Sequence, residues 1–217
     1  MSAALPTAPE PTIPDPSPAS LTLRQPSSPP TSSPIQPPPL AWFEGTWNVT
    51  HSSLPLWKKN KNVSITYTRI PGTSPPHIDD LIHFTPNAGT KLRSVHGVDK
   101  PFTPGSGSMV EGKQEGEGGG DGKEERASLA YQWRGKGWLM VAASKWEVLG
   151  YGEEEGTGVE WVVTYFLKTV FTPAGVDIMV RGGRLGKGMV ERIKKGVEGL
   201  GGEVGRQVGG LFEVGFD

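Results

Sequence analysis

Histidine is the residue type in this 217-residue chain that offers the most chemistry, as a metal ligand, a haem ligand or a general base. The chain has four, at His51, His77, His83 and His96. No two have the close spacing of a zinc or iron site on one element, and the chain has no cysteine. His51, His83 and His96 could converge only across neighbouring strands of a barrel. We therefore predict no metal and no cofactor, haem included.

Other kinds of catalytic group have little support in the sequence. The serines at 52, 53 and 144 lie in no G-x-S-x-G context, so the turn that presents a hydrolase nucleophile is missing. Asp177 or Glu147 could act as a general acid or base if it pointed into a dry pocket. Alternation along the chain places Glu147 on the face opposite Trp146, which points it outward. No catalytic residue is therefore assigned.

Three stretches alternate apolar or aromatic residues with polar ones, which is typical of strands that have one face in a core. The residues that share the apolar face are, over 63–69, Val63, Ile65 and Tyr67; over 137–148, Met140, Ser144 and Trp146; and over 159–168, Trp161, Val163 and Tyr165. These strands would bring several aromatic rings to one interior.

Eight such runs predict an all-β domain. They lie near 43–52, 62–70, 78–85, 91–98, 128–134, 137–149, 159–171 and 174–181. Turn-forming residues separate them, and short links join antiparallel neighbours. Eight antiparallel strands with short links suit a closed up-and-down barrel, which can enclose one small ligand. We predict such a barrel over 41–184, with a β-sandwich as the structural alternative.

The first run contains Gly45-Thr46-Trp47, with an aromatic residue two positions before the glycine and a β-branched residue two after the tryptophan. This resembles the G-x-W signature of lipocalins and the wider calycin superfamily. In lipocalins the tryptophan packs at the closed end of the barrel under an arginine that follows the last strand. The resemblance implies that Trp47 lies under Arg181 or Arg184, and the sequence leaves the choice open.

The resemblance covers roughly 41–205. Within it, GTWNVTHSSLPLWKKNKNVSITYT and EWVVTYFLKTVFTPAGVDIMVR are similar to a group of small lipocalin-like proteins of filamentous fungi. Some fungal lipocalin-like proteins guide the cyclisation of polyketide products, although they are generally larger. The chain departs from secreted lipocalins because it has no cysteine with which to form a disulfide.

Strand alternation predicts what lines the barrel. If Trp47 points inward, His51 does so as well. The predicted ligand-binding residues are His51, Tyr67, Met140, Ser144, Trp146 and Tyr165. A pocket of this kind suits a lipophilic molecule with one or two polar groups. The first hypothesis is therefore a binding protein. The second is a cofactor-free isomerase or cyclase that positions a reactive substrate, with His51 or Tyr67 contributing a hydrogen bond.

The segments outside the strands have distinct compositions. Residues 1–40 hold 13 of the 21 prolines and predict a disordered tail. The P-x-x-P spacings at Pro26–Pro29 and Pro34–Pro37 would also suit weak docking to a polyproline-binding partner. The Gly/Glu-rich residues 103–127 predict a flexible loop. Over 185–217, apolar residues recur every three or four positions and predict an amphipathic helix. Glycines weaken this helix, so we expect it to pack on the barrel rather than on a second copy or a membrane.

Charge and hydropathy limit the partners. The 22 basic and 23 acidic residues nearly balance, which gives no long-range attraction for nucleic acid. No apolar stretch reaches the length that spans a bilayer, and prolines occupy the place of a signal-peptide core. The absence of cysteine fits a reducing compartment. We predict a cytoplasmic protein with no membrane span, and the sequence leaves its oligomeric state open.

Overall fold

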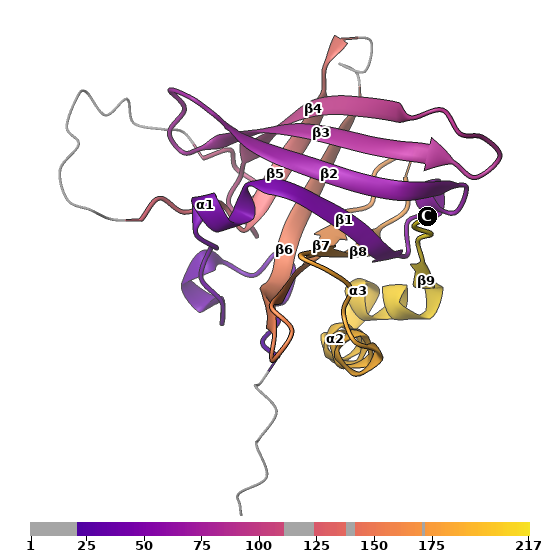
Figure 1. Ribbon diagram of the computed structural model, residues 1–217. Coiled ribbons are helices and arrows are strands. Elements are labelled where there is room, and N and C mark those ends of the chain that lie inside the picture. Colours follow the sequence, from indigo (N-terminus) through magenta and orange to yellow (C-terminus); the bar gives the residue numbers. More distant parts are fainter. Residues whose placement is uncertain (1–20, 111–123, 138–141, 171) are drawn as a thin grey trace, which may run out of the picture.

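Eight antiparallel strands form a closed barrel in the computed structural model, which describes residues 21–110, 124–137, 142–170 and 172–217 (Figure 1). The strands are β1 (Gly45–Ser52), β2 (Asn60–Ile70), β3 (His77–Pro86), β4 (Arg93–Pro101), β5 (Ala130–Gly135), β6 (Ala143–Glu154), β7 (Val159–Phe166) and β8 (Gly175–Arg181). Each pairs with its successor, and β1 closes the barrel by pairing with both β2 and β8. The predicted up-and-down barrel is confirmed.

Apolar side chains form two layers, one on each side of the barrel wall. The inner layer includes Trp47, Val63, Tyr67, Trp146 and Met179. The outer layer lies between the wall and helix α2 (Lys187–Gly199), and includes Trp161, Val163, Ile178, Ile193 and Val197. Because β7 and β8 are covered on both faces, nearly all of their residues are buried.

The C-terminal segment packs on the outside of the barrel (Figure 1). Helix α2 is followed by α3 (Gly202–Arg206), the 3₁₀ turn η4 (Gln207–Gly210) and a short strand, β9 (Phe212–Glu213). The predicted C-terminal amphipathic helix is confirmed as α2, and the rest of the segment 185–217 is divided among α3, η4 and β9. Helix α2 does not continue into α3 because Gly201, which lies between them, has a φ of 66°, outside the right-handed helical region. No helix among the described residues is long and apolar enough to cross a membrane.

Residues 21–40, which we call the N-terminal strap, pack against the barrel. The predicted disorder over 1–40 is wrong for this half, and residues 1–20 lie outside the described residues. Leu23 fits against two glycines, since a Cβ at Gly150 would lie 2.3 Å, and one at Gly196 2.9 Å, from its side chain. The backbone N–H of Arg24 donates to Leu149 O at 2.8 Å. The strap therefore joins the wall to α2.

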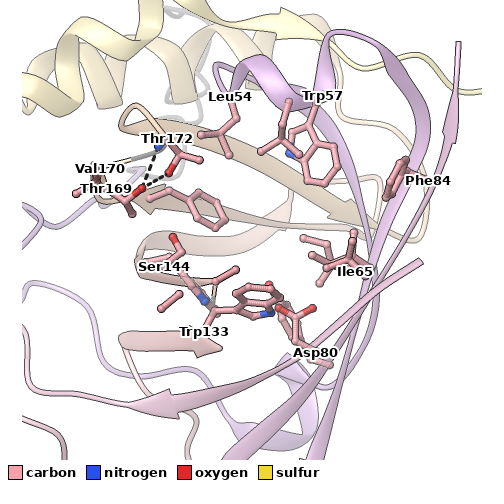
Figure 2. A pocket seen from close by; sticks show the side chains of 18 residues that line it. Leu54, Trp57, Ile65, Asp80, Phe84, Trp133, Ser144, Thr169, Val170 and Thr172 are labelled. Atoms are coloured by element: carbon pink, nitrogen blue, oxygen red, sulfur yellow. Dashed lines mark hydrogen bonds between the residues drawn. The ribbon is translucent and has the colours of Figure 1, made fainter. Parts of the chain in front are cut away.

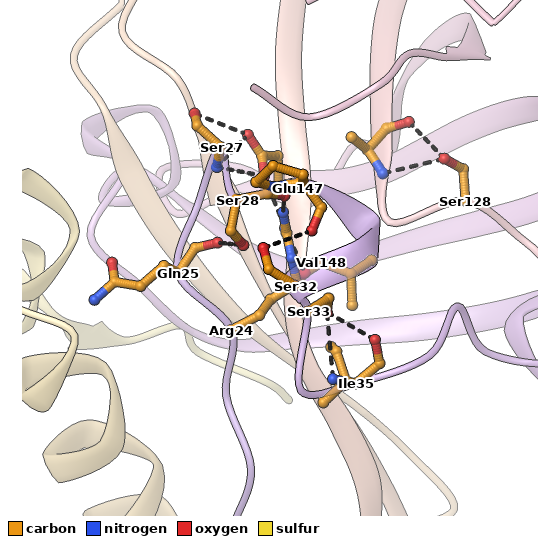
Figure 3. A network of polar contacts seen from close by, with 12 residues as sticks. Arg24, Gln25, Ser27, Ser28, Ser32, Ser33, Ile35, Ser128, Glu147 and Val148 are labelled. Atoms are coloured by element: carbon orange, nitrogen blue, oxygen red, sulfur yellow. Dashed lines mark hydrogen bonds and ion pairs between the residues drawn. The ribbon is translucent and has the colours of Figure 1, made fainter. Parts of the chain in front are cut away.

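One buried ion pair anchors the strap (Figure 3). Arg24 Nη1 lies 2.7 Å from Glu147 Oε2, and the two side chains are 0% and 1% exposed. Arg24 also donates to the carbonyls of Val148 and Ser28, and the Ser27 N–H donates to the Glu147 carboxylate at 2.9 Å. Glu147 does point outward, as alternation predicts, but the strap covers it.

The structure of the strap also differs from two further predictions, the extended Pro-rich stretch and the flexible loop over 103–127. Pro26 and Ser27 form a turn in which Ser27 has a φ of 60°, so the P-x-x-P stretch Pro26–Pro29 is not an extended polyproline helix. The end of the predicted 103–127 loop is fixed to the strap, because Ala127 donates to Pro38 O and Glu125 O accepts from Leu40. Residues 111–123 of that loop lie outside the described residues.

Candidate functional site

A cavity of about 480 Å³ occupies the open end of the barrel (Figure 2). Its described lining is mostly apolar or aromatic, and consists of Leu54, Leu56, Trp57, Ile65, Tyr67, Asp80, Ile82, Phe84, Val95, Trp133, Ala142, Ala143, Ser144, Trp146, Phe166, Thr169, Val170 and Thr172. Leu56 and Val170 are 47% and 93% exposed, so the lining reaches the molecular surface as apolar side chains. These two exposed side chains give an apolar molecule a first contact at the surface.

Stacked aromatic rings fill the barrel beneath the cavity. Phe43 stacks on Tyr67 with ring centres 4.8 Å apart, and Trp146 lies 5.9 Å from Tyr67 and 4.9 Å from Tyr131. Tyr67 and Trp146 belong both to this stack and to the cavity lining. The barrel is thus packed solid at its closed end and hollow at its open end.

Arg181 seals the closed end. Its guanidinium carbon lies 4.4 Å from the centre of the Trp47 ring, a cation–π arrangement. Its N–H groups donate to the carbonyls of Trp42 and Glu44 at 2.8 and 2.7 Å, and to the Glu160 carboxylate at 2.6 Å. The Arg184 side chain is 70% exposed and lies 3.8 Å from Glu213. Of the two arginines that the sequence left open, Arg181 holds the position over Trp47.

Two buried carboxyl groups lie at the floor of the cavity. Asp80 lines the cavity and is 4% exposed, and Asp99 is fully buried. The two carboxyls lie within hydrogen-bonding reach of each other, and Trp146 Nε1 donates to Asp99 Oδ1 at 2.8 Å. Burial and the charge of Asp99 raise the pKa of Asp80 well above its usual value, and burial raises the pKa of Asp99 to about 7. The pair therefore holds at least one proton at neutral pH.

A third buried carboxyl, Asp177, lies on β8. It accepts a hydrogen bond from Ser52 Oγ at 2.5 Å and one from Trp57 Nε1 at 3.3 Å. Burial raises its pKa to about 7. Trp57 lines the cavity, so Asp177 fixes the orientation of one wall ring.

The structure brings three of the six predicted ligand-binding residues to the cavity: Tyr67, Ser144 and Trp146. Met140 lies outside the described residues. His51 is not in the lining, because a β-bulge between Val49 and His51 adds one residue to β1 and reverses the alternation. Ser52 points inward instead, and His51 faces Lys194 of α2 and Glu213 of β9. Burial and the charge of Lys194 lower the pKa of His51.

Tyr165 also lies on the other side of the wall. With Trp161 and Val163 it belongs to the outer apolar layer, so the predicted inward direction of this face of β7 is wrong. The inner face of β7 carries Val162 and Phe166. Burial raises the pKa of Tyr165 to about 12, helped by the charge of Glu203 on α3.

The histidines do not converge. His96 Nε2 lies 2.8 Å from Asp79 Oδ2 in a partly exposed pair that Lys136 joins, on the opposite face of β3 from Asp80. No group of three or more His, Asp or Glu side chains in the described part of the chain could hold a metal ion.

Asp80 is a site residue that the sequence analysis does not assign, because two adjacent aspartates at the start of a strand are expected to lie in solvent. A signal was present. Ile78, Asp80, Ile82 and Phe84 alternate along β3, which places Asp80 on the apolar face. A charged residue in the middle of an apolar face indicates one of two things. Either the assumed alternation is shifted by one residue, or the charged group is buried in the interior.

Trp133 reaches the floor of the cavity only because position 97 is glycine. A Cβ at Gly97 would lie 2.2 Å from Trp133 Nε1, and Gly97 pairs with Asp80 across β3 and β4. We expect Gly97→Ala to displace the indole, lower the free energy of unfolding by about 1–3 kcal/mol and shift the tryptophan emission. Urea unfolding followed by fluorescence measures both. Gly89→Ala, where a Cβ meets nothing within 4 Å, is the matched control and should leave both unchanged.

Comparisons with known proteins identify the fold. No family model and no curated protein matches the chain. Similar solved structures include apocrustacyanin C1, with 11% identity, a TM-score of 0.51 and coverage of 81% of this chain and 78% of that one. Another is lobster apocrustacyanin A1, with 10% identity, a TM-score of 0.50 and coverage of 82% and 79%. These matches support the predicted lipocalin-like fold. The resemblance to fungal proteins stays a prediction.

Proposed function

We propose that this protein binds a small hydrophobic or amphipathic molecule inside the open end of its barrel. One observation carries the proposal: the cavity of about 480 Å³ has a mostly apolar lining that continues to the surface through Leu56 and Val170. Small-molecule sites typically have volumes of roughly 300–1,000 Å³ and a few polar groups in an apolar wall. Asp80, Tyr67 and Ser144 are such groups. The predicted intracellular location is part of this proposal.

Filling the cavity tests this function. Val95 lines the cavity and Ser94, its neighbour on β4, is exposed. We expect Val95→Phe to weaken binding of aliphatic alcohols and terpenoids about tenfold or more, because the larger ring takes the ligand's volume. Ser94→Phe adds the same ring outside and should leave binding unchanged. Native mass spectrometry and calorimetric titration measure both, and equal affinities of the two variants would refute the proposal.

A cofactor-free isomerase or cyclase, as in fungal secondary metabolism, is the second candidate, and Asp80 favours it. A carboxyl that stays protonated in an apolar pocket can protonate a bound substrate. His51 takes no part, because it lies outside the barrel wall. In this case Asp80→Asn would abolish turnover of a polyketide-type substrate and retain its binding.

A further inference from the structure

We propose that the ligand of this cavity is an amphipathic amine, a lipophilic molecule whose protonated nitrogen binds to the carboxyl pair Asp80 and Asp99. The inference rests on the proposed function and narrows it to one chemical class. An amine as the ligand also means that fatty acids do not bind well. A fatty acid would require a basic residue in the apolar barrel to pair with its carboxylate.

The first argument is an unmet hydrogen-bonding requirement. Asp80 Oδ1 and Asp99 Oδ2 are buried, and no group of the described residues outside the pair donates a hydrogen bond to either atom. The protein offers these two oxygens only the proton that the two carboxyls share. Buried polar atoms without a partner are rare, and each requires an explanation. Asp80 lines the cavity, so a nitrogen at the cavity floor can reach it (Figure 2). An ammonium group has three N–H donors, which suits two carboxyl groups side by side.

The second argument is the sign of the charge around the pair. The ionisable groups that act on Asp80, Asp99 or the adjacent Tyr67 from β2, β3, β5 and β8 are Tyr67, Asp79, Tyr131 and Asp177. All are acidic or neutral. The described lining of the cavity contains no lysine, arginine or histidine. A cation is therefore the partner that the protein itself does not supply, and an anionic ligand would be repelled.

The third argument is the aromatic surface beside the pair. Trp146 donates to Asp99, and its ring centre lies 5.9 Å from that of Tyr67. Trp133 passes over Gly97, the residue paired with Asp80. Aromatic faces attract cations and compensate part of their lost hydration. The floor of the cavity thus offers both the negative charge and the ring faces that an ammonium group requires.

Binding should exchange a proton for the ligand. The amine arrives as an ammonium ion. Below about pH 7, where both carboxyls are protonated, the pair releases one proton to solvent and the resulting carboxylate pairs with the ammonium group. One proton leaves for each cation bound, so affinity should rise as the pH is raised. An alkylamine behaves like lysine, whose usual pKa is about 10.4, and stays protonated over this range.

The experiment compares three ligands of equal chain length: decylamine, decanol and decanoate. By calorimetric titration at pH 7.5 we expect decylamine to bind about tenfold or more tighter than decanol, the usual gain from a charge-assisted hydrogen bond. Decanoate should bind most weakly. Asp80→Asn should reduce the decylamine preference to about threefold or less and leave decanol binding intact. Asp79→Asn, the same change on the outer face of β3, should keep the preference.

Proton release by the unaltered protein supplies a test that does not depend on a variant folding. Titrations of decylamine at pH 6, below the pKa of about 7 of Asp99, in two buffers with different ionisation enthalpies should show release of close to one proton, and decanol should release none. Equal affinity for decylamine and decanol, or no proton release, would overturn this inference and leave the proposed function standing. Failure of all three ligands to bind would count against both.

Discussion

Arg24→Met is expected to lower the free energy of unfolding by about 3–5 kcal/mol. The change leaves the Glu147 carboxyl 1% exposed and without its cationic partner, which is the costly way to break a buried ion pair. The contacts of Arg24 with the carbonyls of Val148 and Ser28 are lost at the same time. Urea unfolding followed by circular dichroism gives the difference.

The double variant Arg24→Met with Glu147→Gln separates loss of the pair from loss of the strap. A glutamine at 147 carries no charge and can still accept the Ser27 N–H, so most of the stability should return. Arg69→Met breaks the exposed pair with Glu125 and should cost no more than about 1 kcal/mol. If Arg24→Met and Arg69→Met cost the same, the strap does not depend on its ion pair.

The strap shows one limit of what the sequence predicts. Arg24 is the only basic residue among the first 40, and its partner lies 123 positions away. Nothing local distinguishes Glu147 from the other glutamates, so the pairing cannot be read from spacing. The segment also has few apolar residues to bury. The apolar residues that do pack are Leu21, Leu23, Ile35 and Leu40. They suffice because glycines at 150 and 196 make room for Leu23, and because Glu147 neutralises the charge of Arg24.

The strands show a second limit. Alternation identified all eight strands and the correct inner face of β2 and β6, where one face meets the interior and the other is more polar. It failed on β7, because helix α2 buries the outer face as well and both faces are apolar. It failed at His51 because one bulge residue reverses every later side chain of β1. The inner face of a strand therefore cannot be assigned from alternation where both faces are buried or where the strand contains a bulge.

Asp80 and Asp99 are not assigned from the sequence for a different reason. Asp is seldom fully buried, so a sequence reading places it in solvent by default. Asp80, Asp99 and Asp177 are nevertheless among the least exposed polar residues described. Burial raises the pKa of all three carboxyls, so the free energy of unfolding depends on pH.

Asp177→Asn is expected to stabilise the protein at pH 8 by up to roughly 4 kcal/mol. The pKa of Asp177 is about 7 in the folded state against 3.8 in a free side chain. Between these values the folded state binds the proton that the unfolded state has released, so stability falls as the pH rises from about 4 to about 7. Above pH 7 the full cost of burying the ionised carboxylate is present. Asparagine carries no charge and avoids that cost.

The asparagine can keep the local hydrogen bonds, which makes the comparison clean. Its amide oxygen can accept from Trp57 Nε1, and its NH₂ can donate to Ser52 Oγ, whose hydroxyl can rotate to suit. At pH 4 the aspartic acid is protonated and the two proteins should be about equally stable. The gain should appear between pH 4 and 7, as a shallower decline in urea unfolding free energy for the variant.

Asp217→Asn is the control, because the pKa shift of this exposed carboxyl has the opposite sign. Hydrogen bonding to Lys61 lowers the pKa of Asp217. It should show no gain at pH 8. Asp80 and Asp99 also make the unfolding free energy of the unaltered protein decline with pH, in the same direction as Asp177. Asp177→Asn should therefore reduce this decline and not remove it.

A constant difference in unfolding free energy between variant and unaltered protein from pH 4 to 8 would mean that Asp177 stays ionised in the folded state. The barrel would then stabilise a buried carboxylate through Ser52 and Trp57 alone, and its interior would favour negative charge where we expect it to favour the protonated acid.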